Sequence, residues 1–239
     1  LVLDTKKSFG DLLGGRFYFL PLVWVGIFLS IFQQFVGINV IFYYSTTLWQ
    51  SVGFKESDSF LISVIMATTN VVATLIAISL IDHLGRKRLL LIGSGTMAAS
   101  LAVMAIAFSR AFLVDGKLTL PSPWGELALV AANLFIVGFG ASWGPIVWVL
   151  LSEMFPNSIR TMALGIGGGA QWLANFVVST SFPMLAGLGL HVAYGLYASF
   201  AFISFFFVLR WVRETKGKTL EQMHLFDTPE PLGELPQVD

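Results

Sequence analysis

Long stretches of this 239-residue chain contain no charged residue. Five such stretches cover residues 17–54, 59–81, 89–109, 127–152 and 161–209. A helix needs roughly 20 apolar residues to cross the hydrocarbon core of a bilayer. The three middle stretches each fit one span, and the first fits a long span with an uncharged loop. The last fits two spans joined by a tight turn at 185–190, so the pattern predicts six membrane helices.

We therefore expect an all-α membrane protein. The composition agrees, because 56% of the residues are hydrophobic and only 12% are charged, about half the charged share of a soluble domain. A six-helix transmembrane bundle is predicted at 18–212, between a cytoplasmic lead-in at 1–17 and a cytoplasmic tail at 213–239 that is helical only in its first part. Its helices are predicted at 18–48, 59–81, 89–110, 126–152, 161–185 and 191–212. The first three helices begin on one side of the membrane and the last three on the other, as in transporters built from two inverted three-helix repeats.

The basic residues predict how the bundle is oriented. If both termini are cytoplasmic, eleven of the fourteen Lys and Arg residues lie inside, and only Lys55, Arg110 and Lys117 lie outside. Short cytoplasmic loops of membrane proteins carry such an excess of Lys and Arg. We expect a multi-pass protein of the cell (inner) membrane with both termini in the cytoplasm.

Several classes of function are disfavoured by the composition and the motifs. The chain has no cysteine and a formal net charge of zero, which excludes disulfides and argues against a nucleic-acid partner. No P-loop is present, so ATP does not drive the chain directly. Residues 140–144 match the G-x-S-x-G pattern of serine hydrolases, and residues 165–170 resemble a dinucleotide fingerprint, but neither follows a predicted strand. We expect no enzymatic activity, no cofactor and no metal.

The predicted spans carry neutral polar side chains instead of ionisable ones. Eight amides and indoles at membrane depth are candidate ligand contacts: Gln33, Gln34 and Asn39 in the first span, Asn70 in the second, Trp148 in the fourth, and Gln171, Trp172 and Asn175 in the fifth. Gln171 and Asn175 are four residues apart and share a helix face. Trp148 follows Gly144 and Pro145, where a kink is expected to free backbone carbonyls.

Amide groups hydrogen-bond hydroxyls, and aromatic faces cover the C–H faces of a sugar ring. The polar set therefore favours a neutral polyhydroxyl ligand over an ion. The alternative is that the amides hydrogen-bond one helix to another, and for Asn70 and Trp148 this packing role is as well supported as ligand contact.

Four motifs resemble those of sugar porters of the major facilitator superfamily. Residues 33–45 resemble the seventh helix of the family, and residues 82–88 resemble the loop between helices eight and nine. Residues 143–160 resemble helix ten with its loop, and residues 213–222 resemble the tail motif. The resemblance covers most of the chain and implies the carboxyl-terminal half, helices seven to twelve, of a twelve-helix fold. The sequences of these motifs are similar to those of bacterial proton-coupled xylose and glucose symporters.

The resemblance also implies roles for the matching residues. The polar residues named above match sugar contacts, with Asn175 as an additional candidate. Tyr43 and Tyr44 match the outer gate. A cytoplasmic charge cluster that holds the inward side closed is implied at Asp82, Arg86, Lys87, Glu153 and Arg160. The tail motif departs from the family at Arg213, where proline is usual.

The implied function is transport of a neutral monosaccharide, either a hexose, a pentose or a polyol, by alternating access. Proton-coupled symport is expected in the complete protein, with the amino-terminal six-helix half and the lipid bilayer as partners. An uncoupled sugar facilitator and a non-transporting sugar sensor are the alternatives. A six-helix channel is disfavoured because no charged or polar filter ring is visible in the sequence.

Overall fold

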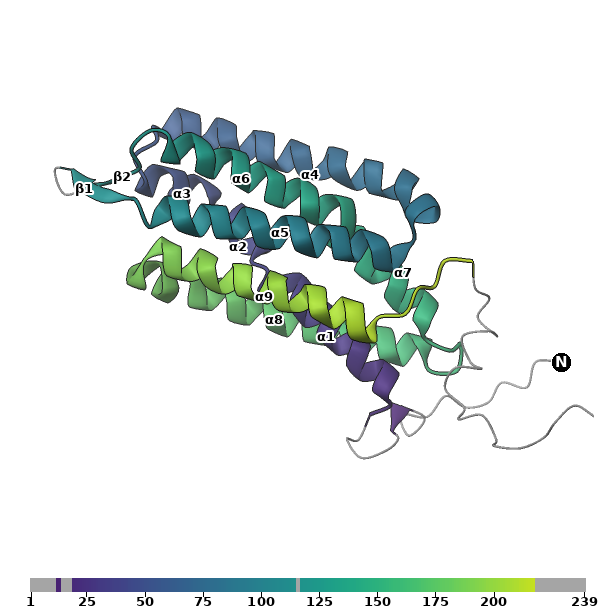
Figure 1. Ribbon diagram of the computed structural model, residues 1–239. Coiled ribbons are helices and arrows are strands. Elements are labelled where there is room, and N and C mark those ends of the chain that lie inside the picture. The colour runs from purple at the N-terminus through teal and green to yellow at the C-terminus, as the bar shows by residue number, and fades with distance from the viewer. Residues whose placement is uncertain (1–11, 14–18, 115–116, 218–239) are drawn as a thin grey trace, which may run out of the picture.

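The computed structural model describes residues 12–13, 19–114 and 117–217. Within these residues the chain forms a bundle of helices with a two-stranded hairpin at one end (Figure 1). The elements are α1 (Pro21–Phe35), α2 (Ile38–Tyr43), α3 (Ser45–Ser51), α4 (Glu56–Leu84), α5 (Arg86–Phe108), β1 (Phe112–Val114), β2 (Lys117–Thr119), α6 (Trp124–Gly138), the π-helical turn η2 (Phe139–Trp143), α7 (Gly144–Met154), α8 (Arg160–Leu188) and α9 (Leu190–Trp211).

Five helical segments of the described chain are long and apolar enough to cross a membrane. They are Pro21–Tyr43, Glu56–Leu84, Arg86–Phe108, Trp124–Met154 and Leu190–Trp211. The helix α8 is not among them, because its glycines, amides and hydroxyl side chains lower its hydropathy. With 29 residues it is nevertheless long enough to span. All six predicted spans are therefore helical, and five also have the composition of a membrane helix.

The span predicted at 18–48 consists of three helices. Gly37, between α1 and α2, has a φ of 84°, a left-handed backbone that glycine adopts without a steric penalty. A Cβ at this position would lie 2.6 Å from Cδ2 of Tyr197 in α9, so the break also requires a residue without a side chain. A second interruption, at Tyr44, separates α2 from α3.

The span predicted at 126–152 is interrupted as well. It is observed as α6, η2 and α7, and the π-helical turn ends at Trp143, directly before Gly144 and Pro145. Proline lacks the N–H that a regular helix needs, and π-helical turns are common where long helices are distorted. A side chain at Gly93 of α5 would collide with Ser142, so α5 and the turn are in close contact. The distortion predicted at Gly144 and Pro145 is confirmed.

The connections differ from the predictions in three places. The outer loop predicted at 111–125 contains the antiparallel pair β1 and β2, with Phe112 opposite Thr119. The turn predicted at 185–190 is shorter, because α8 ends at Leu188, Gly189 has a φ of 131° and α9 begins at Leu190. Residues 213–217 of the tail are not helical, while 218–239 and most of the predicted lead-in lie outside the described residues.

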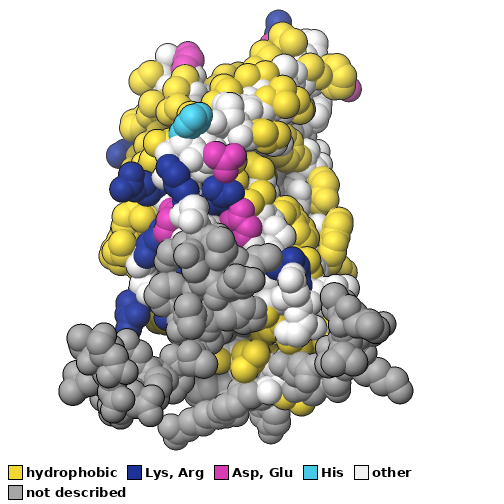
Figure 2. Space-filling view, turned by 90° about the vertical axis from the view of Figure 1, so that its right-hand side faces the viewer, with side chains coloured by type: hydrophobic (Ala, Val, Ile, Leu, Met, Phe, Trp, Pro, Cys, Tyr) yellow, Lys and Arg dark blue, Asp and Glu magenta, His cyan; other side chains and the backbone are white. Residues whose placement is uncertain are grey.

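Successive long helices alternate in direction, so the bundle has two distinct ends. The starts of α1, α5 and α8 and the end of α9 lie at the right of Figure 1, and the hairpin lies at the opposite end. Because α6 starts at the hairpin end, the units α1–α5 and α6–α9 run in opposite senses. Figure 2 views the end opposite the hairpin and shows basic and acidic side chains gathered there.

Candidate functional site

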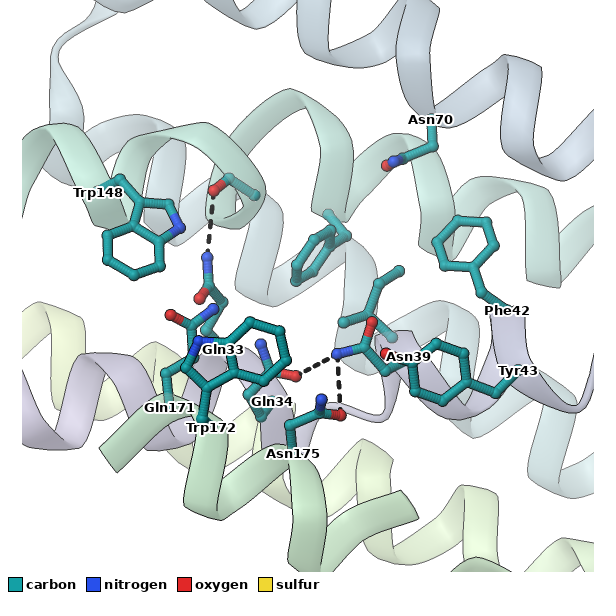
Figure 3. Close-up of a pocket in the computed structure, with 13 residues that line it drawn as sticks. Gln33, Gln34, Asn39, Phe42, Tyr43, Asn70, Trp148, Gln171, Trp172 and Asn175 are labelled. Carbon is teal, nitrogen blue, oxygen red and sulfur yellow. Dashed lines mark hydrogen bonds between the residues drawn. The ribbon is translucent and has the colours of Figure 1, made fainter. Parts of the chain in front are cut away.

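A cavity of about 380 Å³ lies among α1, α2, α4, η2, α7 and α8. All eight polar and indole residues singled out from the sequence line it: Gln33, Gln34, Asn39, Asn70, Trp148, Gln171, Trp172 and Asn175. The other lining residues are Ile38, Phe42, Tyr43, Phe139 and Gly144. Residues up to 142 positions apart in the sequence, Gln33 and Asn175, are thereby brought to one site (Figure 3). None of these lining residues is charged.

Gln33 crosses from α1 to the interruption in the fourth span. Its Nε2 donates hydrogen bonds to the backbone carbonyls of Trp143, at 2.9 Å, and Gly144, at 3.1 Å. The side chain is buried, with 2% of the residue exposed, and its Oε1 is enclosed without a hydrogen-bond partner in the described chain. Gln33 therefore joins two helices through its nitrogen, while its oxygen is enclosed beside the cavity without a partner among the described residues.

Asn39 is the centre of a second group of amides (Figure 3). Its Nδ2 donates to Oε1 of Gln34 at 2.6 Å and to Oδ1 of Asn175 at 3.0 Å. Ser179, one turn beyond Asn175 on α8, donates its hydroxyl to the same Oδ1 at 3.1 Å. These bonds connect α2, which follows the Gly37 break, to α1 and α8. The amides therefore do hydrogen-bond helices together, as the alternative interpretation required, but they also converge on a cavity.

Aromatic side chains form the accessible side of the cavity. Trp172 is 69% exposed and Tyr43 is 61% exposed. Trp148 is less exposed, at 41%, and its indole is directed toward the amides in Figure 3. An arrangement of neutral donors and acceptors beneath flat aromatic faces can bind a small, uncharged, hydroxylated molecule.

Comparison with known proteins places the chain in a family. The family model described as sugar (and other) transporter matches residues 3–226. The chain belongs to this sugar transporter family.

Two curated relatives illustrate the match. A glucose transport protein of Synechocystis sp. is 56% identical over 222 residues, which cover 92% of this chain and 47% of the relative. The D-xylose-proton symporter of Escherichia coli is 38% identical over 240 residues, which cover 96% of this chain and 47% of the relative. The chain thus spans about half the length of the curated relatives it matches.

The fold agrees with that of a solved transporter. The structure of the major facilitator superfamily proton:xylose symporter XylE from E. coli, bound to 6-bromo-6-deoxy-D-glucose, matches with a TM-score of 0.74 at 37% sequence identity. The match covers 85% of this chain and 42% of XylE. The described bundle therefore corresponds to one half of the major facilitator fold.

The two tyrosines assigned to the gate lie in different surroundings. Tyr43 lines the cavity, whereas Tyr44 does not. The hydroxyl of Tyr44 donates to the carbonyl of Ser179 at 3.2 Å, and its ring lies 4.8 Å from that of Phe182. Tyr44 therefore attaches the interruption between α2 and α3 to α8, while Tyr43 is exposed beside the cavity.

The expected charge cluster forms around Arg86 at the bundle end shown in Figure 2. Its guanidinium makes a two-pronged ion pair with Glu153, with Nε to Oε2 at 3.0 Å and Nη2 to Oε1 at 2.7 Å. Nη1 contacts Oδ1 of Asp82 at 3.0 Å. Lys87 instead donates to the carbonyl of Leu209 at 2.9 Å. The α4–α5 turn, the end of α7 and the end of α9 are thereby joined within this one chain.

Arg160 lies apart from these contacts. Its Nε donates to the carbonyl of Phe155 at 3.2 Å, and its Nη2 is buried without a partner in the described chain. The expectation that Arg160 shares the cluster is therefore not met in this conformation. The physical reason is that its carbonyl contact holds it to its own loop.

Two further residues, Glu214 and Thr215, belong to the cluster and were not predicted from the sequence. Glu214 accepts hydrogen bonds from the backbone N–H groups of Arg86, at 2.9 Å, and Lys87, at 3.1 Å. It thereby caps the start of α5, where a negative charge is favourable. The hydroxyl of Thr215 donates to Glu153. Both residues lie in the tail motif at 213–222, which resembles that of the family, but its spacing and residue types gave no reason to assign them to the cluster.

Proposed function

We propose that this chain is the carboxyl-terminal half of a monosaccharide transporter that works by alternating access, with proton-coupled symport in the complete protein. The observation that carries the proposal is the cavity whose thirteen lining residues are all uncharged and include eight amide or indole side chains. Membership of the sugar transporter family and the names of the relatives support it. The ligand we propose is a hexose, a pentose or a polyol without formal charge.

A cavity without charged residues should reject charged sugars. A charged ligand would lose its hydration there without gaining an opposite charge. In the complete transporter, we expect glucose and xylose to compete for labelled sugar, whereas gluconate and glucosamine compete at least about tenfold less well. Equal competition by the charged sugars would contradict the proposal.

The direction of the chain in the membrane is also proposed. We assign the charge cluster to the cytoplasmic side of the cell membrane and the hairpin to the outside, with both termini cytoplasmic, because basic residues concentrate near the cluster. These 239 residues contain no cysteine, so a cysteine introduced among them can be compared with the unmodified protein. A membrane-impermeant thiol reagent added to intact cells should label Ser57→Cys, at the start of α4, and not His83→Cys, at its end. The reverse pattern would invert the topology.

Coupling to protons needs a group that titrates near the sugar. No residue that lines the cavity is acidic or basic, so we assign the coupling group to the amino-terminal half. An uncoupled facilitator is the alternative. Uptake by the complete transporter that stops when an uncoupler is added supports symport, and uptake that only equilibrates the sugar supports the facilitator.

A further inference from the structure

The hydrogen bonds of Gln33 fix which of its atoms faces a ligand. An amide side chain offers both a donor and an acceptor, and the two ends are usually interchangeable. Here both partners of Nε2, the carbonyls of Trp143 and Gly144, can only accept. The nitrogen must therefore point toward them. The amide nitrogen is thereby engaged by two carbonyls, and the enclosed Oε1 is left without a partner among the described residues.

The two carbonyls belong to a segment that is itself held in place. They lie at the end of η2 and the start of α7. The π-helical turn there is less favourable than a regular α-helix, so other contacts must stabilise it. The indole of Trp143 donates from Nε1 to Oγ of Ser94 at 2.9 Å and to the carbonyl of Leu90 at 3.1 Å. Both acceptors lie on α5, and Trp143 is completely buried.

We infer that Trp143 and Ser94 are positioning residues which lock the amide of Gln33, so that Gln33 accepts a hydrogen bond from a sugar hydroxyl and never donates one. This inference rests on the proposed function and adds a rule of selectivity to it. The hydroxyl that meets Gln33 must act as a donor. A substituent that can only accept, such as fluorine, would face Oε1 without a hydrogen between them.

The lock can be tested without any sugar. In the complete transporter, Gln33→Ala and Trp143→Phe should both lower the melting temperature. If Trp143 acts through the same hydrogen bonds, the double variant should deviate from additivity by about 2 °C or more. Additive effects would overturn the lock, whether or not the protein binds sugar.

The selectivity rule is tested with glucose analogues in which each hydroxyl in turn is replaced by fluorine. In the wild type, we expect one analogue to bind at least about tenfold more weakly than glucose. In Trp143→Phe the amide is released and can turn its nitrogen toward fluorine. The ratio of glucose to fluoroglucose affinity should then fall at least about threefold at that position and stay constant at the others. Unchanged ratios, or equal changes at every position, would overturn the inference.

Two buried serines provide a second variant and its control. Ser94→Ala removes one acceptor of the indole and should lower the same ratio, which decides the matter if Trp143→Phe does not fold. Ser204 in α9 lies 3.0 Å from Ser94 through the two Oγ atoms and is equally buried, but the indole bonds to Ser94 and not to it. Ser204→Ala should therefore leave the ratio at its wild-type value. A change of the same size in Ser204→Ala would show a general packing effect and overturn the lock.

Discussion

At the scale of single residues, the cavity amides differ in how much of their hydrogen-bonding capacity is already used. The amide nitrogen of Gln33 donates to two carbonyls of the fourth span, and that of Asn39 donates to two neighbouring amides. The side chain of Gln171 lines the same cavity and makes no hydrogen bond within the described chain. Substitutions of these residues should therefore separate an effect on binding from an effect on stability.

Gln33→Ala in the complete transporter is expected to weaken sugar binding at least about tenfold, about 1.4 kcal/mol, because a buried hydroxyl of the ligand loses its partner. It should also lower the melting temperature without sugar, because two hydrogen bonds between helices are removed. Calorimetric binding and thermal unfolding measure the two effects. The control is Gln171→Ala, which should weaken binding without changing the melting temperature. A Gln33→Ala protein of unchanged stability would contradict the structural role.

At the scale of elements, the break at Gly37 sets the position of the whole amide group. It allows α2 to leave the direction of α1, and this places Asn39 against both Gln34 and Asn175. The ring of Tyr197 occupies the space next to the glycine. The local backbone, the packing of α9 and the wall of the cavity therefore depend on one residue.

Gly37→Ala should destabilise the protein by about 2 kcal/mol or more, because the residue has a positive φ and a methyl group would meet the ring of Tyr197. Gly95→Ala is the matched control, since Gly95 is inside α5 and nothing lies within 4 Å of its Cβ position. Alanine there should be neutral or slightly stabilising. Chemical unfolding in detergent compares the two, and equal stability of both variants would show that the break tolerates a side chain.

Much of this arrangement was predictable from residue types and spacing. Gln171 and Asn175 share a helix face because they are four residues apart. Pro145 predicts a distortion because it has no backbone N–H to donate a helical hydrogen bond. The interruption at Tyr44 and the hairpin at 112–119 were not predictable in the same way. Tyr44 is held by a carbonyl 135 positions away, and Leu120, directly after the hairpin, donates to the carbonyl of Val52. Such distant contacts leave no local pattern.

At the scale of the whole molecule, the ion pair between Arg86 and Glu153 connects the start of α5 to the end of α7. The carboxylate of Glu153 is partly shielded, with 30% of its side chain exposed, whereas that of Asp82 is 78% exposed. An exposed ion pair contributes little to stability, because water screens it and the side chains lose freedom. The two carboxylates therefore differ in their expected effect on the transporter.

Glu153→Gln should shift the complete transporter toward the inward-open state and slow uptake while sugar binding survives. The reason is that the amide cannot form a two-pronged ion pair with Arg86. The rate at which a thiol reagent modifies a cysteine in the inner cavity reports this shift. Asp82→Asn, the control, should change that rate much less. An unchanged rate in Glu153→Gln would mean that the cluster has no influence on the conformational equilibrium.

The isolated chain should not accumulate sugar in liposomes. Accumulation against a gradient requires a titrating group coupled to the sugar site, and none lines the cavity. A single bundle also lacks a second bundle against which to move. The measurement is uptake of labelled glucose and xylose by purified 1–239 under an imposed proton gradient. Accumulation that an uncoupler abolishes would show that this chain contains the complete coupling machinery.

The polar character of α8 has a consequence for how the protein is made. A segment rich in glycine, amides and hydroxyls partitions poorly from the translocon into lipid by itself. Only Gly189 separates α8 from the more apolar α9. The two helices are therefore expected to enter the bilayer together, as a hairpin, once α9 has left the ribosome. The features that give the cavity its amides thus make biogenesis of this helix dependent on the sequence that follows it.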